Sequence, residues 1–292
     1  MKSLLLRGIL AAALLACGHA AAQTAAVVEG VQMPAFIDRD GRRSPVSPGM
    51  ALKAGDKLFT GAGSRLLIKL SEGSLVKLGE NGNLQIKELE PSKSVFKAAL
   101  GVLEGAFRFT TDVVAKKRKR EVNITVATVT AGIRGTDLWG KSSPDKQIVC
   151  LIEGRIEVGA PGEAPVAMDQ PRQFYQREKG TTAPIALVEE AQLAAWAKET
   201  EIEAGNGATR RGGKWKVELL SADQQSAALD AYDQVRAAGY AAELIPTLKS
   251  DKRGEKRVYV VRIGSLPSKK EAEALAGQLR GKYGVADPKV SS

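Results

Sequence analysis

The side chains best suited to bind a ligand or form a buried ion pair lie between Thr128 and Asp137, in the stretch Thr-Val-Thr-Ala-Gly-Ile-Arg-Gly-Thr-Asp. Gly132 and Gly135 lie on either side of Arg134, and glycine lets a backbone bend sharply or approach another backbone closely. Arg134 and Asp137 are three residues apart across this bend, where a guanidinium can reach a carboxylate. The pattern predicts a β corner closed by a salt bridge, with a ligand site at Arg134 as the alternative.

A run of basic residues precedes this corner. It consists of Lys116, Lys117, Arg118, Lys119 and Arg120. Because the run lies between two stretches with strand character, the simplest interpretation is a solvated hairpin tip that also discourages pairing at a sheet edge. The alternative is a docking site for anionic glycan peptides or lipid phosphates, which the same charges would attract. The run and the corner together form the candidate recognition surface of this part of the chain.

The chain lacks the side chains of the common catalytic and metal centres. Its only histidine is His19, and its cysteines are Cys17 and Cys150. Ser-His-Asp triads, Cys-His pairs and multi-histidine metal sites are therefore excluded, and no glycine-rich phosphate loop is present. We expect no catalytic residue, no metal and no cofactor. A lytic transglycosylase would need a catalytic glutamate in a helical domain or paired carboxylates in a cleft, whereas Glu153 and Glu157 are better explained as exposed strand positions.

Residues 1–22 have the pattern of a secretory signal peptide. The basic residues Lys2 and Arg7 come before an apolar run, and three alanines end the segment. The exported chain would then belong to the periplasm. Leu-Leu-Ala followed by Cys17 also resembles a lipoprotein box, so lipidation of Cys17 is an alternative to simple cleavage. No other apolar run approaches the ~18 residues of a membrane helix, and we expect no transmembrane helix in the mature chain.

Cleavage after residue 22 would remove two basic residues and lower the formal net charge from +10 to +8. A basic surface in the periplasm suggests anionic polymers or lipid head groups as partners, and solubility is the alternative explanation. Nucleic acid is not an expected partner in that compartment. Cys150 would be the only cysteine left, so we expect no intramolecular disulfide and a buried thiol that packs as a small apolar group.

Short apolar runs separated by Gly, Asn, Asp and Ser extend over residues 27–178. Strands are expected at 65–70, 74–78, 83–87, 101–109 and 123–129. This rhythm predicts an all-β domain, wound as a roll or a short solenoid.

Two connecting segments follow the β domain. Residues 186–204 are rich in helix formers and predict a linker helix, with Trp196 packing against the β domain. Residues 205–213, Gly-Asn-Gly-Ala-Thr-Arg-Arg-Gly-Gly, have the composition of a flexible linker.

A different rhythm occupies residues 214–292. Strands are expected at 215–219, 240–247, 257–264 and 287–290, and helices at 223–238 and 269–282. The order β-α-β-β-α-β is that of a split βαβ, or ferredoxin-like, α+β domain with both helices on one face of the sheet. The chain is therefore expected to be multidomain.

The N-terminal motifs resemble those of the FecR-type periplasmic domain. Besides the stretch 128–137, the resemblance rests on Leu52-Lys-Ala-Gly-Asp-Lys-Leu-Phe-Thr60, Gly63-Ser-Arg65, Glu72-Gly-Ser-Leu75 and Val149 to Val158, which follow the family's order. Glu72 stands where the family usually has aspartate. The resemblance implies a β surface that docks another envelope protein or a polymer. The family's signalling role, relayed by a membrane helix to an anti-sigma segment, is not expected because the sequence shows neither part.

The C-terminal motifs resemble those of the SPOR domain, a module that binds peptidoglycan glycan strands lacking stem peptides. The resemblance rests on Trp215-Lys-Val-Glu, Ala238-Gly-Tyr-Ala-Ala242, Val258-Tyr-Val-Val-Arg-Ile-Gly-Ser-Leu-Pro-Ser268 and Glu271-Ala-Glu-Ala-Leu275. In that family the sheet face without helices holds the glycan, so the resemblance implies a groove on this face.

Alternate residues of a strand lie on the same face of a sheet, and this alternation indicates which residues face the groove. The expected glycan-binding residues are Lys216, Glu218, Val260 and Arg262 on its floor, with Ser221 and Ser265 at its ends. Arg262 can donate several hydrogen bonds to sugar hydroxyls and acetamido carbonyls. The family usually has glutamine where Glu218 stands, and a carboxylate accepts from hydroxyls but cannot donate to an acetamide. A fold kept only for protein contacts is the alternative.

Together these patterns predict a non-enzymatic periplasmic protein that binds peptidoglycan. Its C-terminal domain would bind denuded glycan strands, as found at the division septum, and its β domain would dock another envelope protein or a polymer. The alternatives are a cell-wall-active enzyme or its regulatory subunit, and a scaffold of an envelope complex that binds no glycan.

Overall fold

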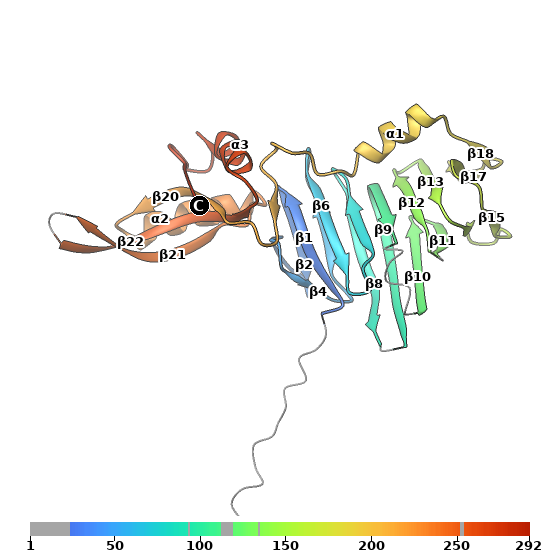
Figure 1. Cartoon of the computed structure of the whole chain (residues 1–292), viewed down its shortest axis with the longest axis horizontal. Coiled ribbons are helices and arrows are strands. Elements are labelled where there is room, and N and C mark those ends of the chain that lie inside the picture. Colours follow the sequence, from blue (N-terminus) through green and yellow to red (C-terminus); the bar gives the residue numbers. More distant parts are fainter. Residues whose placement is uncertain (1–23, 93, 112–118, 134, 252–253) are drawn as a thin grey trace, which may run out of the picture.

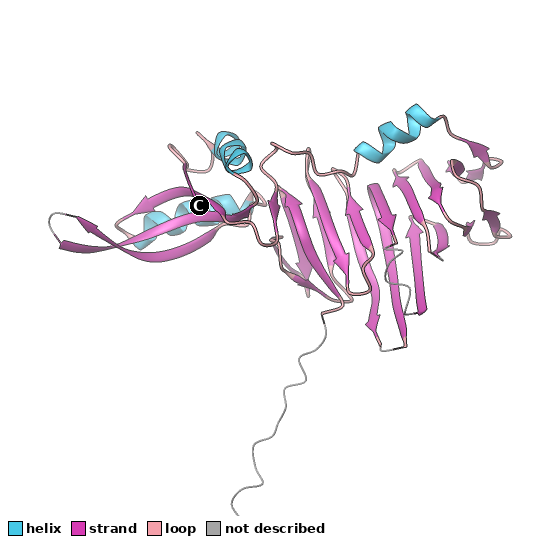
Figure 2. Ribbon diagram, viewed as in Figure 1, coloured by secondary structure: helices cyan, strands magenta, loops and turns pink. Residues whose placement is uncertain are grey.

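The computed structural model describes residues 24–92, 94–111, 119–133, 135–251 and 254–292. Across these residues the molecule is mostly β, with three short helices and a separate sheet at the C-terminal end (Figures 1 and 2). The predicted signal peptide and Cys17 lie outside the described residues. We call residues 24–187 the N-terminal β module and residues 214–292 the C-terminal module.

Two layers of strands form the N-terminal β module, and both share β9 (Val95–Thr110). The first layer runs through β1 (Ala26–Gln32), β6 (Arg65–Leu70), β7 (Leu75–Leu78), the second half of β9, β12 (Asp137–Ser142), β13 (Lys146–Glu153) and β16 (Gln173–Glu178). Four two-residue strands flank it: β4 (Ala51–Leu52) and β19 (Thr209–Arg210) beside β1, and β17 (Thr181–Thr182) and β18 (Ala186–Leu187) beside β16.

The second layer runs through β3 (Arg42–Pro45), β2 (Ala35–Arg39), β5 (Lys57–Thr60), β8 (Asn83–Pro91), the first half of β9, β10 (Lys119–Val126), β11 (Val129–Ile133), β14 (Ile156–Gly159) and β15 (Val166–Met168). Among the described residues, neighbouring strands of these two layers are antiparallel, except that β9 and β10 run parallel.

Alternation of apolar and polar residues explains why the layers pack face to face. In β10, Val122, Ile124 and Val126 are buried, whereas Glu121 and Asn123 are exposed. The buried side chains of both layers join one apolar core, to which β9 contributes Phe96 and Phe107. Burial of such alternate residues is what holds a two-layer β structure together.

One expected strand is divided in the structure. Residues 123–129 were expected to be continuous, but β10 ends at Val126 and β11 begins at Val129. Ala127 has a φ of +50° and donates its N–H to the carbonyl of Val102 at 2.8 Å. A left-handed residue cannot continue an extended strand, so the chain folds back here into an antiparallel pair.

Helix α1 (Glu190–Lys198) is shorter than the helix expected over 186–204. Trp196 packs against the N-terminal β module as expected, with its ring stacked on that of Trp139 at 4.7 Å between centroids. The residues after α1 cross the first layer because their carboxylates find basic partners there: Lys141 Nζ lies 2.8 Å from Glu199, and Glu201 pairs with Lys77. We call residues 199–213 the strap (Figure 1).

The last part of the strap, expected to be a flexible linker, is held between the two modules. Thr209 and Arg210 form β19 and pair with β1, and the Thr209 hydroxyl donates to the carbonyl of Val31 at 3.1 Å. Glu271, only 6% exposed, accepts hydrogen bonds from the N–H groups of Gly205, Gly207 and Ala208 at 2.5, 2.7 and 3.0 Å. These bonds order a segment whose glycine content suggested flexibility.

The C-terminal module has the expected order of elements. They are β20 (Trp215–Ala222), α2 (Gln225–Ala237), β21 (Glu243–Asp251), β22 (Gly254–Leu266), α3 (Lys269–Leu279) and β23 (Lys289–Ser291). The sheet order is β21-β22-β20-β23, with antiparallel neighbours. Val217 and Ile263 are buried with residues of both helices, which leaves the opposite face of the sheet without a helix.

The C-terminal module also contacts the end of the N-terminal β module at β1 and β2. The N–H of Ala35 donates to the carbonyl of Gly239 at 3.1 Å, and the N–H of Ala241 lies 3.3 Å from the sulfur of Met33. We call this contact, together with the Glu271 bonds to the strap, the seam. The direct contact between the two modules joins segments about 200 residues apart in the sequence, since Met33 and Ala241 are separated by 208 positions.

Candidate functional site

The sheet face of the C-terminal module without helices, here called the open face, carries four of the six expected groove residues together. Glu218 lies opposite Arg262 in the register of β20 and β22, and Ser221 lies opposite Val260. The register shifts by one residue between Glu218 and Leu220, so Ser221 returns to the same face as Glu218. Val260 shares this face because it is two residues from Arg262.

Ion pairs and hydrogen bonds cross the open face. Lys249 Nζ donates to Ser221 Oγ at 3.0 Å and lies 3.4 Å from Glu218 Oε1. Arg262 Nε donates to Glu243 Oε2 at 3.3 Å. All four charged side chains are partly exposed, from 29% for Glu218 to 59% for Glu243. Exposed pairs of this kind contribute about 0–1 kcal/mol, so a ligand can replace them at small cost.

Val260 does not offer the exposed floor that the sequence suggested. It is 6% exposed. Because β22 lies between β21 and β20, Lys249 of β21 must extend over β22 to reach Ser221 of β20. This crossing explains why an apolar residue on a helix-free face is buried.

The other two expected groove residues lie away from the Glu218 and Arg262 pair. Lys216 lies opposite Ser291 of β23, and its Nζ donates to the carbonyl oxygen of Ser292 at 3.3 Å. Ser265 has a φ of +63°, and its backbone is packed so tightly against Gly213 that a Cβ on Gly213 would lie 2.4 Å from it. Ser265 therefore supports the end of the strap.

Two residues of the open face were missed from the sequence, Glu243 and Lys249. The strand containing them was expected to span 240–247, so Lys249 fell beyond its predicted end, whereas β21 extends to Asp251. The usable signal was the alternation of Glu243, Ile245, Thr247 and Lys249, which places all four on one face.

The expected corner lies where the chain passes from the second layer to the first, between β11 and β12. Gly135 has a φ of +70°, which favours glycine, but a Cβ on Gly132 would meet nothing closer than 3.9 Å. The predicted bridge from Arg134 to Asp137 stays a prediction, and the structure shows another cationic partner of Asp137. Asp137 accepts a bidentate pair from Arg108, at 2.9 Å from Nε and 2.6 Å from Nη2, and Arg134 lies outside the described residues.

The pairing follows from strand register. Arg108 lies in β9 and Asp137 at the start of the neighbouring β12, and the guanidinium also reaches Glu201 of the strap at 3.3 Å. The bonds to Asp137 raise the pKa of Arg108 above its ordinary value. The half-buried pair anchors the strap to the first layer, so the structure gives Asp137 an architectural role.

The described part of the basic run borders a cavity of about 1000 Å³. Lys119 pairs with Glu121 at 3.0 Å, and Arg120 Nη2 donates to the carbonyl of Glu72 at 3.2 Å. Lys116, Lys117 and Arg118 lie outside the described residues. The cavity is lined by residues of β10, β11 and β14, among them Lys119, Arg120, Asn123, Gly132, Arg155 and Glu157. The structure thus brings Gly132 together with the end of the basic run, and adds Arg155, which sequence reasoning missed.

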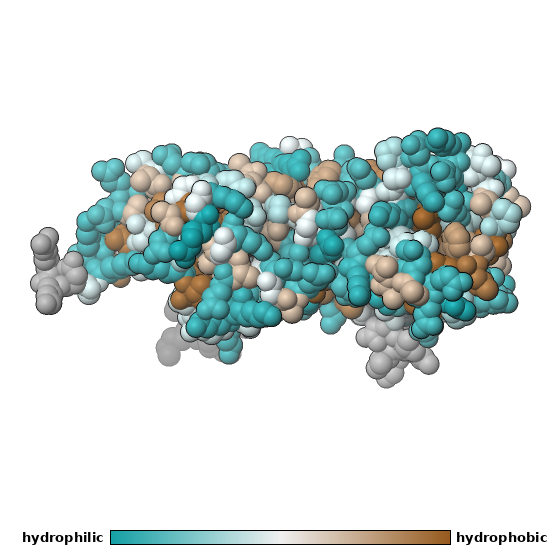
Figure 3. All heavy atoms as spheres, turned by 90° about the horizontal axis from the view of Figure 1, so that it is seen from above, coloured by the Kyte–Doolittle hydropathy of each residue, from teal (hydrophilic) through white to brown (hydrophobic). Residues whose placement is uncertain are grey.

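A second, more apolar cavity of about 810 Å³ lies beside α1. Trp139, Ile148, Phe174 and Leu187 line it. Figure 3 shows hydrophobic surface at this end of the molecule. Cys150 packs with Trp139, Ile148 and Phe174, so its thiol is buried as expected. Burial raises the pKa of this thiol to about 12.

Comparisons with known proteins address the two modules separately. Residues 56–157 match the family model "FecR protein", and residues 212–288 match the model "SPOR domain". Both are envelope-associated families of non-catalytic binding or regulatory domains. No curated protein matches the chain.

Two crystal structures are similar to the chain, both of a candidate anti-sigma factor from Parabacteroides distasonis, at 1.65 and 2.50 Å resolution. Each has a TM-score of 0.40, with 14% and 13% sequence identity. The matches cover 48% and 76% of this chain, and 64% and 89% of the respective structures. The chain thus spans less than two thirds of the first of them.

Within the described ranges, no helix has the length and apolar character needed to cross a membrane, and no group of three or more His, Cys, Asp and Glu residues is arranged to hold a metal. The family matches agree in order and position with the motifs of both modules. The chain therefore contains a FecR domain followed by a SPOR domain.

Proposed function

We propose that this protein is a non-enzymatic, periplasmic peptidoglycan-binding protein whose SPOR domain binds denuded glycan strands on the open face. The observation that carries the proposal is the SPOR match combined with a helix-free sheet face on which Glu218 and Arg262 lie opposite each other. Arg262 supplies donors, and Glu218 and Ser221 supply acceptors, for the hydroxyl and acetamido groups of a glycan. The sheet order β21-β22-β20-β23 supports a ferredoxin-like arrangement.

Glycan binding on this face requires exchange of partners. Lys249 and Glu243 would release Glu218, Ser221 and Arg262 to the sugar, and the Lys249 side chain would uncover Val260 for contact with a pyranose ring. Because the exposed pairs contribute little to stability, the exchange leaves the fold intact.

The experiment is co-sedimentation of the mature chain with purified sacculi, before and after an amidase removes the stem peptides. We expect pelleting to rise after amidase treatment and to fall in the Arg262→Ala, Glu218→Ala double variant. The matched control is Glu273→Ala. Glu273 is an exposed residue of α3 that pairs with Lys269 of the same helix, and its variant should pellet like the parent. Absence of pelleting under both conditions would refute glycan binding.

We propose the cavity beside β10, β11 and β14 as the docking surface of the FecR domain for another envelope protein or an anionic polymer. Lys119 and Arg155 on its wall support an acidic partner. Pelleting with stem-peptide-bearing sacculi should persist in the open-face double variant and fall in Lys119→Ala, Arg155→Ala if the partner is the wall polymer. Turbidity of sacculi over the same incubation separates binding from lysis, and a decline would favour the cell-wall enzyme alternative.

A further inference from the structure

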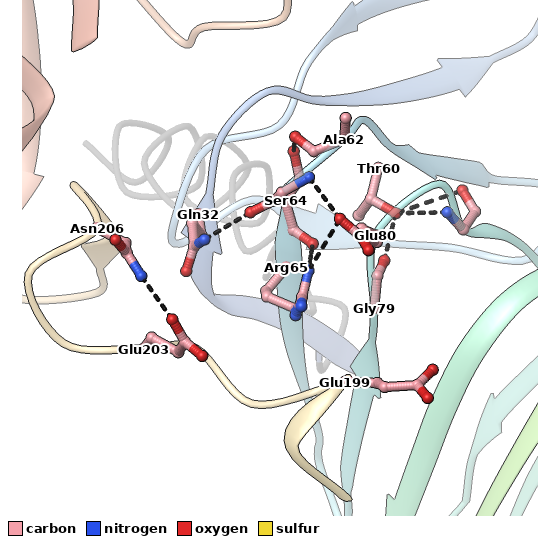
Figure 4. Close-up of polar contacts among 12 residues, drawn as sticks. Gln32, Thr60, Ala62, Ser64, Arg65, Gly79, Glu80, Glu199, Glu203 and Asn206 are labelled. Atoms are coloured by element: carbon pink, nitrogen blue, oxygen red, sulfur yellow. Dashed lines mark hydrogen bonds and ion pairs between the residues drawn. The ribbon is translucent and has the colours of Figure 1, made fainter. Parts of the chain in front are cut away.

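A polar cavity of about 400 Å³ lies at the seam between the two modules. Its walls come from three parts of the chain: β1 and β6 of the N-terminal β module, the strap, and the C-terminal module. Figure 4 shows Gln32 and Arg65 on one side of this space and Glu203 and Asn206 on the other. We call it the seam pocket. Cavities of about 300–1,000 Å³ accommodate small-molecule ligands.

Two buried polar atoms of the seam pocket residues lack a partner within the described part of the chain. They are Gln32 Oε1, an acceptor, and Arg65 Nε, a donor. The rest of each side chain is fixed: Gln32 Nε2 donates to the carbonyl of Gly63 at 2.5 Å, and Arg65 Nη1 donates to the carbonyl of Ser64 at 2.7 Å. Buried polar atoms normally have partners, so an unpaired donor and acceptor beside one cavity indicate a ligand.

The opposite wall is held in place by hydrogen bonds of its own. Asn206 Nδ2 donates to Glu203 Oε2 at 2.9 Å, and the carbonyl of Asn206 accepts from Gln278 Nε2 at 3.0 Å. Tyr240, a residue that is 9% exposed, adds an aromatic ring. The strap is thereby fixed to α3 at this point, and the pocket does not depend on an unanchored loop.

The charges of the pocket walls favour an anion. Arg65 and Lys282 are cationic, and Glu203 is the only acidic residue among the lining residues. Glu80 lies 4.0 Å from Arg65 and offsets part of its charge, whereas Lys282 has no ion pair among the described side chains. Amides, a guanidinium and an aromatic ring are the groups that bind saccharides, and the net positive charge selects an acidic one.

We propose that the seam pocket binds a small saccharide that carries a carboxylate, with Arg65 and Lys282 holding the carboxylate and Gln32 accepting from a sugar hydroxyl. A ligand there touches both modules and strengthens the seam. The inference stands on the pocket itself and does not depend on glycan binding by the open face.

The test is isothermal titration calorimetry of the mature chain with N-acetylmuramic acid and with N-acetylglucosamine. The two sugars share the ring and the acetamido group, and only the first carries a carboxylate. We expect saturable binding of N-acetylmuramic acid and at least about tenfold weaker binding of N-acetylglucosamine, because charge-assisted hydrogen bonds are about twice as strong as neutral ones. Equal affinities, or binding of neither sugar, would overturn the proposal.

Variants locate the binding. Arg65→Ala and Lys282→Ala should each weaken binding of N-acetylmuramic acid about fivefold or more, whereas Lys69→Ala, on the exposed side of the same strand as Arg65, should leave it unchanged. Lys282 is exposed, so its variant tests the pocket even if Arg65→Ala fails to fold. Unchanged affinity in Lys282→Ala and in a folded Arg65→Ala would contradict the assignment.

The same variants separate the seam pocket from the open face. Arg65→Ala and Lys282→Ala should pellet with amidase-treated sacculi like the parent, and the Arg262→Ala, Glu218→Ala variant should bind N-acetylmuramic acid like the parent. Loss of monosaccharide binding in the open-face variant would assign the sugar to that face and refute the seam pocket.

Discussion

Glu271 of the seam and Glu218 of the open face belong to the same module but differ in the environment of their carboxylates. Glu271 is 6% exposed and accepts three backbone hydrogen bonds of 2.5 to 3.0 Å from the strap. Glu218 is 29% exposed and lies 3.4 Å from Lys249. A buried carboxylate with all its partners in place stabilises a structure, whereas an exposed one with a weak partner is available to a ligand.

The difference extends to the regions around the two residues. The seam is formed by backbone groups, buried side chains and a glycine packed against a ring, all of which fix geometry. The open face is formed by long charged side chains that can change partners without moving the backbone. We therefore expect changes at the seam to alter stability and changes on the open face to alter binding.

Glu271→Ala should have the largest effect on stability. It leaves three N–H groups of the strap without their acceptor in a buried site, which should cost about 3 kcal/mol or more of unfolding free energy. The measurement is urea unfolding of the chain without residues 1–22, the predicted signal peptide. The control is Glu273→Ala on the exposed side of the same helix, expected within about 0.5 kcal/mol of the parent. Equal stability of the two variants would remove the distinction drawn between buried and exposed carboxylates.

Gly239→Ala should also weaken the seam, by about 1–3 kcal/mol. Gly239 has a φ of +90°, and an added Cβ would lie 2.8 Å from the ring of Phe36 and from Pro34. Gly277→Ala in α3 is the matched control, because a Cβ there meets nothing within 4 Å. Its helical position predicts a gain of about 0.5–1 kcal/mol. In thermal or urea unfolding, a loss of stability in Gly239→Ala and a gain in Gly277→Ala would support the seam contact. Unchanged stability in Gly239→Ala would argue against it.

Alkaline pH should loosen the seam through Tyr240. Burial, helped by repulsion from Tyr283, raises the pKa of Tyr240 above that of an ordinary phenol. The folded state thus favours the neutral phenol, so the contribution to stability is complete below about pH 10 and falls as the pH rises further. Tyr240→Phe should lose less stability than the parent in urea titrations above about pH 10. If the unfolding free energies of the parent and of Tyr240→Phe fell equally with pH, ionisation of Tyr240 would not be coupled to unfolding.

Much of each module was predictable because its signals are local. A short apolar run predicted β6 at residues 65–70, and helix formers followed by Gly239 predicted the end of α2. Each module also carries enough motif residues to indicate its family. Signals of this kind need only neighbours in sequence.

The seam and the salt bridges were not predictable, because their partners are distant in sequence. The Arg108 partner of Asp137 is 29 residues away in sequence and lies beside Asp137 only through the register of β9 and β12. Gly205 to Gly213 has the composition of a flexible linker, and its order comes from Glu271, 66 residues after Gly205. Composition therefore cannot distinguish a free linker from one whose glycine N–H groups bind a buried carboxylate.

Glu218→Gln should have the smallest effect on stability and still change binding. Its pair with Lys249 is exposed, so the unfolding free energy should stay within about 0.5 kcal/mol of the parent. A glutamine at this position can donate to an acetamido carbonyl as well as accept from a hydroxyl, whereas the carboxylate can only accept. Pelleting with amidase-treated sacculi should therefore increase. A destabilised variant, or one that pellets less, would show that Glu218 has a structural role like that of Glu271. The side chains of the open face would then not be free to exchange partners with a ligand.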